Sequence, residues 1–355
     1  MQLGLTFNTR SEAGISSGNP AGLADDGEEE FDSLATVQAI ADTLASLGHE
    51  VELLGDGEPL LRRLLDGPRP DLVFNIAEGI GAARSREARV PAVLEMLGIP
   101  YTGSDPLTLA VALDKPIAKQ LVAAAGVNVP RGVVVPALDA DEASPDGFRP
   151  ASNIPAATTR ELQSLELPLI AKPAFEGSSK GVLEKCLIIQ EDQLVPVIQQ
   201  LRAAYCQPIL VEQYISGEEL TVGVLGNAPP VVIGVMRIVP KQQETNFIYS
   251  LEVKRDWENR VRYECPAEIS PAATAAVQQA AISAYTALGC RDLARIDFRL
   301  RGDTPYFIEA NPLPGLSPKT GDIVLLANGV GVEHRELLRR ILEAATARIG
   351  TLCEI

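Results

Sequence analysis

Residues 295–322 read RIDFRLRGDTPYFIEANPLPGLSPKTGD, and the fold prediction starts from this stretch. Polar and apolar residues alternate from 295 to 299 and again from 306 to 311, while residues 301–304 (RGDT) are typical of a turn. The pattern predicts a β-hairpin. Because successive side chains of a strand point to opposite faces, Arg295 and Asp297 share one face of the first strand, and Glu309 and Asn311 share one face of the second.

If the two strands pair across the turn, one guanidinium, two carboxylates and an amide meet on one patch. Carboxylate and amide oxygens can bind Mg²⁺ when water and nucleotide phosphates complete its coordination. The alternative is a surface hairpin with a solvated polar face. Residues 311–315 (NPLPG) favour the metal site, because a rigid loop rich in Pro and Gly leaves the strand directly at the acidic residues.

The composition excludes several classes of partner and of chemistry. A formal net charge of -16 argues against nucleic acid or an anionic membrane, because both bind basic patches. Five cysteines, an odd number without CxxC spacing, indicate reduced thiols in a cytoplasmic protein, and no apolar run approaches bilayer length. Since His49 and His334 are the only histidines, histidine catalysis is not expected.

The order of the expected elements divides the chain into three parts. Apolar runs alternate with helix-like stretches up to a helix start at Asp105-Pro106, so we expect a parallel α/β domain at 1–105. A central subdomain at 106–212 and a C-terminal subdomain at 213–355 follow. Residues 136–159 are rich in Ala, Pro, Ser and Asp, and we expect little order there.

Two further segments have residues that suit a nucleotide. Residues 174–182 (AFEGSSKGV) connect two predicted strands, and such a loop can aim its backbone amides at phosphate oxygens, while Lys172 and Lys180 add positive charge. Residues 209–222 form a strand, an acidic linker and a second strand, and the linker can bind a base edge and sugar hydroxyls. The alternatives are an ordinary hairpin turn and an exposed acidic turn.

Five motifs in this order resemble those of the D-alanine:D-alanine ligase family of the ATP-grasp superfamily. They are Tyr101-Thr102-Gly103-Ser104 with Asp114-Lys115, Lys172-Pro173 with Glu176-Gly177-Ser178-Ser179, Glu212 with Gly217-Glu218-Glu219, Arg295-Ile296-Asp297, and Glu309-Ala310-Asn311-Pro312-Leu313-Pro314-Gly315. The resemblance covers nearly the whole chain. It implies an ATP-grasp fold of mixed α/β and α+β class, with an N-terminal parallel-sheet domain of the Rossmann-like, pre-ATP-grasp type.

The resemblance also implies a role for each matching residue. The ATP phosphates would contact Lys115, Lys172, Lys254, Ser178 and Ser179; adenine would contact Glu212, Gln213, Tyr214 and Ile215; and the ribose would contact Glu219. Asp297, Glu309 and Asn311 would coordinate two Mg²⁺ ions, with Mn²⁺ as an alternative. Arg295 and the amide of Gly315 would stabilise the oxyanion of a tetrahedral intermediate.

The sequence departs from the family around the first substrate. In the family a Glu near the N-terminus, a Ser of the phosphate loop and a Tyr after the mobile-loop Lys form a cluster there. Ser178 matches, and Glu29 is taken as the acid, with Glu28 and Glu30 as open alternatives. The Tyr position is Arg255, in a stretch expected to be loop-like, and a permanent cation there changes the charge of the pocket.

Two further departures concern the glycine-rich parts. The N-terminal glycine pair of the family is absent. After the last glycine the chain reads Ser317-Pro318-Lys319-Thr320-Gly321, where Lys319 or Thr320 would bind the carboxylate of the second substrate. A lysine at this point favours a more acidic acceptor.

The expected function is an ATP-dependent ligase that joins the carboxylate of one amino acid to the amine of another through an acyl phosphate, as in dipeptide synthesis for the cell wall. The identity and stereochemistry of both substrates stay open. One alternative is a ligase for a different amino acid and amine in a specialised pathway, and another is an ATP-binding module without catalysis. We expect small-molecule substrates, a cytoplasmic location and a homodimer, without nucleic acid or membrane partners.

Overall fold

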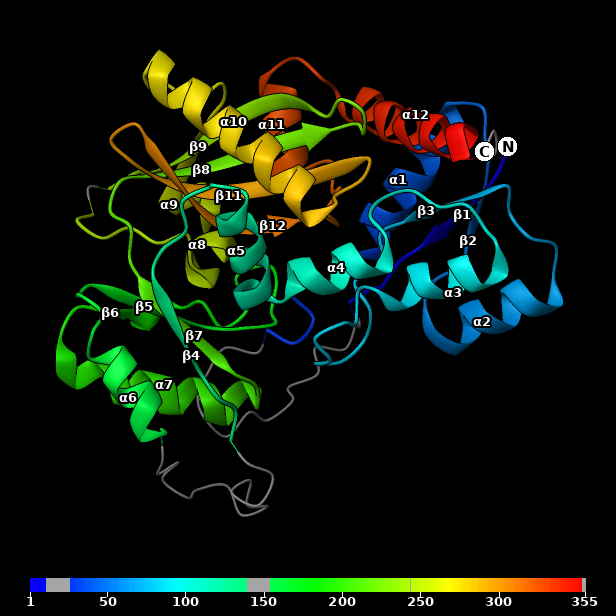
Figure 1. The fold of residues 1–355 in the computed structure, drawn as a ribbon. Helices are drawn as coiled ribbons and strands as arrows, with labels where there is room; N and C mark the ends of the chain where they lie inside the picture. The colour runs from blue at the N-terminus through cyan, green and yellow to red at the C-terminus, as the bar shows by residue number, and fades with distance from the viewer. Residues whose placement is uncertain (11–25, 139–153, 243, 353–355) are drawn as a thin grey trace.

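The computed structural model describes residues 1–10, 26–138, 154–242 and 244–352. Their strands form three separate sheets that follow one another along the chain. Figure 1 shows the blue and cyan N-terminal part on one side, the green central sheet below, and the five-stranded sheet with its yellow and red helices above. The division into three domains stays a proposal, but each sheet falls within one of the expected spans.

The N-terminal sheet is parallel, as the alternation of strands and helices predicted. Its order is β2-β1-β3, with β1 at Gln2–Thr6, β2 at Glu50–Leu53 and β3 at Leu72–Asn75. The connecting helices are α1 (Leu34–Ser46), α2 (Gly57–Asp66) and α3 (Arg89–Leu97). Ser33 caps α1 by accepting a hydrogen bond from the Thr36 amide.

The central sheet is antiparallel and has the order β4-β7-β5-β6. The strands are β4 (Gly132–Val135), β5 (Leu169–Pro173), β6 (Leu187–Ile188) and β7 (Ile209–Gln213), packed against α6 (Ala156–Leu162) and α7 (Glu191–Tyr205). The expectation of little order as far as residue 159 was wrong at its end, because α6 begins at Ala156; residues 139–153 lie outside the described part. The second strand after the phosphate loop is only β6, preceded by a 3₁₀ turn at Glu184–Cys186.

The C-terminal sheet has five antiparallel strands in the order β10-β9-β8-β11-β12. They are β8 (Glu218–Leu225), β9 (Val231–Pro240), β10 (Val261–Glu264), β11 (Leu293–Arg301) and β12 (Thr304–Asn311). Helices α4 (Pro106–Leu113), α5 (Lys115–Ala124) and α10 (Pro271–Leu288) pack on this sheet, as do α11 (Asp322–Gly329) and α12 (His334–Leu352). Two short helices, α8 (Leu251–Arg255) and α9 (Trp257–Arg260), precede β10.

The predicted hairpin is β11 and β12. The strands pair antiparallel around the two-residue turn Gly302-Asp303, and Arg295 lies opposite Asn311 while Asp297 lies opposite Glu309. A bulge follows Asp297 and shifts the register of the rest of the hairpin. The four polar residues therefore occupy two adjacent cross-strand pairs on one face, as the alternation predicted.

The C-terminal helix joins the last part of the chain to the first. Helix α12 packs against α1, and buried residues of both helices share one hydrophobic core with β1, β3 and α11. Burial of a large aliphatic side chain contributes about 1.5–3 kcal/mol, so this shared core holds the N-terminal sheet against the C-terminal one. No helix in the described part of the chain is long and apolar enough to cross a membrane.

Candidate active site

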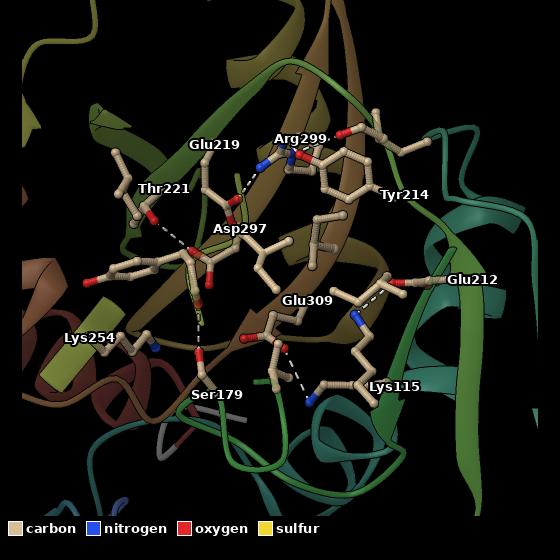
Figure 2. Close-up of a pocket in the computed structure, with 18 of the residues that line it drawn as sticks. Lys115, Ser179, Glu212, Tyr214, Glu219, Thr221, Lys254, Asp297, Arg299 and Glu309 are labelled. Carbon is tan, nitrogen blue, oxygen red and sulfur yellow. Dashed lines mark hydrogen bonds and ion pairs between the residues drawn. The ribbon is translucent and has the colours of Figure 1, made fainter. Parts of the chain in front are cut away.

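A cavity of about 830 Å³, partly open to solvent, lies between the central and C-terminal sheets. Most residues singled out from the sequence line it: Lys115, Lys172, Ser179, Lys180, Glu212, Gln213, Tyr214, Ile215, Glu219, Lys254, Arg295, Asp297 and Glu309. Figure 2 shows Lys115 of α5, Glu212 of β7, Glu219 of β8, Asp297 of β11 and Glu309 of β12 around this cavity.

Asp297 and Glu309 are the acidic pair at the centre of the cavity. Thr221 donates a hydrogen bond of 2.8 Å to Asp297 Oδ1, while Arg295 Nη2 lies 2.9 Å from Asp297 Oδ2. Burial acts to raise the pKa of Glu309, but Lys115, Lys172 and Arg295 outweigh it and hold that pKa well below its usual range. Glu309 is therefore ionised at neutral pH.

The residues present fit a Mg²⁺ site that depends on its nucleotide. Asp297 and Glu309 face each other across the hairpin, and Asn311 lies two residues beyond Glu309 on the same face. Among the described residues no group of three or more His, Cys, Asp or Glu side chains is arranged to hold a metal ion. Two carboxylates and an amide oxygen leave coordination positions for phosphate oxygens and water, as Mg²⁺ prefers.

The predicted phosphate-binding lysines surround this acidic pair. Lys115 Nζ lies 3.2 Å from Glu309 Oε2, and Lys254 Nζ lies 5.1 Å from the centre of the Tyr249 ring. In Figure 2 Lys115 and Lys254 approach Glu309 from opposite sides of the view. Lys172 Nζ lies 2.7 Å from Glu212 Oε1.

Glu212 has a second cationic partner that the sequence interpretation missed. Lys119 Nζ lies 3.0 Å from Glu212 Oε2, and burial lowers the pKa of Lys119 to about 8. Both Glu212 and Lys119 are buried, so Glu212 balances two lysines beneath the cavity. The signal was present in the sequence, because Lys119 is four residues after Lys115 and shares its face of α5.

Arg299 is a second missed residue, and it organises the predicted adenine and ribose segment. Its guanidinium donates hydrogen bonds to Ile215 O (2.9 Å), to Gly217 O (2.9 Å) and to the Tyr214 hydroxyl (2.8 Å), and it forms an ion pair with Glu219. Alternation along β11 places Arg299 in phase with Arg295, which was a usable signal.

Gly217 must be glycine at this linker. Its φ is +127°, and a Cβ atom would lie 1.9 Å from Leu300 O. No other residue allows the linker to approach β11 so closely.

The phosphate loop adopts an unusual backbone at its two serines. Ser178 and Ser179 have φ values of 48° and 60°, in the left-handed region where successive amides can turn toward one ligand. Ser179 lines the main cavity and donates a hydrogen bond of 3.2 Å to Tyr249 O, while Ser178 faces a smaller pocket next to it. The amide of Gly177 donates to Glu30 Oε1 at 2.8 Å and ties this loop to the N-terminal domain.

Among the three candidate N-terminal acids, Glu29 and Glu30 lie in different surroundings. Glu30 is buried, with Arg86 Nη2 at 2.7 Å and Lys180 Nζ at 3.2 Å. Glu29 instead forms a half-exposed ion pair of 2.8 Å with Arg255. Arg255 belongs to helix α8, so the expected loop-like conformation was wrong.

Three residues predicted for the acceptor end are at the surface. Lys319 and Thr320, predicted to bind the acceptor carboxylate, and Gly315, whose amide was predicted to stabilise the oxyanion, are exposed and do not line the main cavity. Asp322, which the sequence interpretation missed, does line it and forms an ion pair of 3.1 Å with Arg295. Arg295 therefore has two acidic partners, Asp297 and Asp322.

This arrangement defines an enzyme of the ATP-grasp class, with a nucleotide-sized cavity held between a four-stranded and a five-stranded antiparallel sheet. Solved structures show the same fold. A D-alanine–D-alanine ligase from Bacillus anthracis complexed with ATP matches with a TM-score of 0.69 and 21% identity over 98% of each chain. The VanG D-Ala:D-Ser ligase from Enterococcus faecalis matches with a TM-score of 0.71 and 21% identity over 97% of this chain and 99% of that one.

Sequence comparison identifies the family. Residues 147–343 match the family model described as D-ala D-ala ligase C-terminus. A D-alanine–D-alanine ligase from Sinorhizobium fredii is 33% identical over 319 residues, which cover 88% of this chain and 93% of that relative. The chain therefore belongs to the D-alanine–D-alanine ligase family. The fold class and the class of enzyme, an ATP-grasp carboxylate–amine ligase, are confirmed.

Proposed function

We propose that this protein uses ATP to join the carboxylate of one amino acid, the donor, to the amine of a second amino acid, the acceptor. The observation that supports it most strongly is the pair of facing carboxylates, Asp297 and Glu309, with Arg295 beside them and lysines around them. Such a set suits a reaction in which phosphate charge must be held in line with a carboxylate nucleophile.

The chemistry has two steps. A carboxylate oxygen of the donor attacks the γ-phosphorus of ATP, so that a new P–O bond forms and ADP leaves with the electrons of the broken P–O bond. The amine of the acceptor then attacks the acyl carbon, phosphate leaves with the C–O electron pair, and the nitrogen loses one proton. The products are ADP, phosphate and an amide.

The residues of the chain position and neutralise the reacting groups. Lys115, Lys172 and Lys254 would bind phosphate oxygens, while Arg295 would stabilise the oxyanion formed on the acyl carbon. Asp297, Glu309 and Asn311 would hold two Mg²⁺ ions. Bound there, Mg²⁺ would neutralise the negative charge of the phosphates.

The experiment follows phosphate release and product mass after the protein is incubated with Mg-ATP and pairs of amino acids. Glu309→Gln should abolish phosphate release while the circular dichroism spectrum stays unchanged. Glu95→Gln, on the exposed side of α3, is the matched control and should keep full activity. Phosphate release by Glu309→Gln at the original rate would refute the metal assignment.

Turnover also decides between this ligase and the alternative of a binding module. No phosphate release with any amine and acid pair would favour the module. A homodimer, a cytoplasmic location and the absence of nucleic acid or membrane partners remain part of the proposal. The homodimer rests on the family resemblance, and sedimentation of the purified protein tests it.

A further inference from the structure

A second pocket lies beside Glu309, on the side of the N-terminal domain. It encloses about 390 Å³, partly open to solvent, and shares Lys115, Glu176 and Glu309 with the main cavity. Asn311 and Ser178 line the end where the phosphate loop meets the hairpin. If the carboxylate of the donor reaches the γ-phosphate from this pocket, the remaining atoms of the donor lie inside the pocket.

The opposite wall of this pocket is made of carboxylates. Glu30, Glu78, Glu87 and Glu176 all line it. Two of them are neutralised by the protein, because Lys180 and Arg86 each form ion pairs with both Glu30 and Glu176.

Glu78 and Glu87 have no such partner. Neither accepts a hydrogen bond from, nor forms an ion pair with, any other residue in the part of the chain that the structure describes. Glu87 is only 6% exposed, so its carboxylate is buried against the pocket. Buried carboxylates without a partner are rare, because desolvation of the charge is costly.

The surroundings of both groups show how poorly this pocket accommodates negative charge. Burial and the neighbouring Glu30 raise the pKa of Glu87 to about 8 although the charges of Arg86 and Lys115 act to lower it. Burial together with Glu87 raises the pKa of Glu78 well above its usual range although the charge of Arg86 opposes this. Ammonium groups need only one or two carboxylate oxygens each, so one such group can pair with each of these two carboxylates.

We propose that the donor amino acid carries a second amino group on its side chain, so that its two ammonium groups pair with Glu78 and Glu87. The inference rests on the proposed function, which supplies the donor carboxylate. The α-ammonium group of any amino acid can neutralise one of the two carboxylates. The other stays buried and unpaired unless the side chain brings a second positive charge.

Diamino acids of increasing side-chain length are the probes, namely 2,4-diaminobutyrate, ornithine and lysine. Each has an isosteric control in which a methyl group replaces the terminal ammonium group: norvaline for 2,4-diaminobutyrate, norleucine for ornithine and 2-aminoheptanoate for lysine. Both enantiomers are needed.

The test measures donor activation without an acceptor. Hydroxylamine attacks the acyl phosphate in place of the second amino acid, so each turnover gives a hydroxamate, ADP and phosphate. We expect kcat/KM for at least one diamino acid to exceed that of its isosteric control by about 100-fold or more, because a site built for a polar group discriminates strongly against an analogue that lacks it. Equal values for the diamino acids and their controls would overturn the inference and leave the proposed function intact.

Two variants separate a role in donor selection from a structural role. Glu87→Gln should lower kcat/KM for the preferred diamino acid by about 100-fold and leave the values for monoamino acids within about threefold. The double variant Glu78→Gln, Glu87→Gln should lose the preference altogether, while Glu95→Gln should retain it. Circular dichroism checks that each variant is folded. A preference for diamino acids that survives in the folded double variant would also overturn the inference.

An absence of hydroxamate with every amino acid, mono or diamino, has a different meaning. That result would refute the proposed activation of an amino-acid carboxylate, and the donor inference would fall with it. The two failures are therefore distinguishable in one assay.

Discussion

Replacement of Arg86 by methionine tests how the phosphate loop is anchored to the N-terminal domain. The Arg86 side chain is 1% exposed and bonds both oxygens of Glu30, at 2.7 and 2.8 Å, as well as Phe175 O at 2.8 Å and Glu176 at 3.3 Å. Methionine keeps most of the apolar volume but removes the charge. Lys180 is then the one cation paired with two buried carboxylates.

The expected loss follows from the charge left behind. Breaking a buried ion pair by removing one partner costs about 3–5 kcal/mol, because a desolvated charge is left uncompensated. The loss should also depend on pH. In the wild type Lys180 and Arg86 outweigh burial and lower the pKa of Glu30. Without Arg86, Lys180 is the remaining cation that opposes burial, so the folded-state pKa of Glu30 rises and the loss of stability caused by the substitution is larger at pH 8, where Glu30 is ionised, than at pH 5.

The assay is urea unfolding at pH 5 and pH 8. It is followed by circular dichroism and by the fluorescence of Trp257, the only tryptophan, because two probes reveal whether the domains unfold together. The control is Arg62→Met, which breaks an ion pair with Glu58 in which both side chains are more than 70% exposed and which should change stability by under about 0.5 kcal/mol. A loss of less than about 1 kcal/mol at pH 8 for Arg86→Met would refute the reasoning.

Three further substitutions test other parts of the site. Thr221→Val removes the hydrogen bond to Asp297, so the Mg²⁺ concentration for half-maximal phosphate release should rise about tenfold. An unchanged Mg²⁺ concentration would contradict a role of Thr221 in orienting Asp297. Arg255→Tyr breaks the half-exposed pair with Glu29, so stability should change by under about 1 kcal/mol while donor preference changes in steady-state kinetics; an unaltered preference would refute the role of Arg255. Burial raises the pKa of Asp32 to about 6, so stability is lost as pH rises from about 4 through 6. Asp32→Asn should remove this loss in thermal melts at pH 5 and 7. Equal pH dependence of the two proteins would contradict this assignment.

The parts of the fold that the sequence predicted are those defined by local patterns. The hairpin required only a period of two and a turn, so the sequence predicted that Arg295, Asp297, Glu309 and Asn311 meet on one patch. The bulge after Asp297, which sets Asp297 opposite Glu309, was not predicted. Helix α10 has strong local signals, because a proline lies at its start and alanine is frequent along it. Helix α8 has five residues, and such a length shows no periodicity, so it was taken for a loop.

The N-terminal half of the site was less predictable because its contacts are distant in sequence. Arg86 is 56 residues from Glu30 and 89 residues from Phe175. The segment around Glu78 and Glu87 lies between β3 and α3 and follows neither a helical nor a strand period, so nothing local marks these acids as buried. The choice among Glu28, Glu29 and Glu30 depends on the rotation of one turn, which sequence spacing does not determine.

Charge balance around Arg295 bears on the acceptor end of the site. The sequence interpretation placed Arg295 beside the metals as a stabiliser of the oxyanion, and Lys319 or Thr320 stays the predicted partner of the acceptor carboxylate. In the structure Asp297 and Asp322 already surround the guanidinium, so a carboxylate brought to Arg295 must compete with Asp322 for it. Because Asp297 is also a predicted metal ligand and Asp322 is not, we expect the charge of Asp322 to have the larger effect on how strongly Arg295 attracts an acceptor.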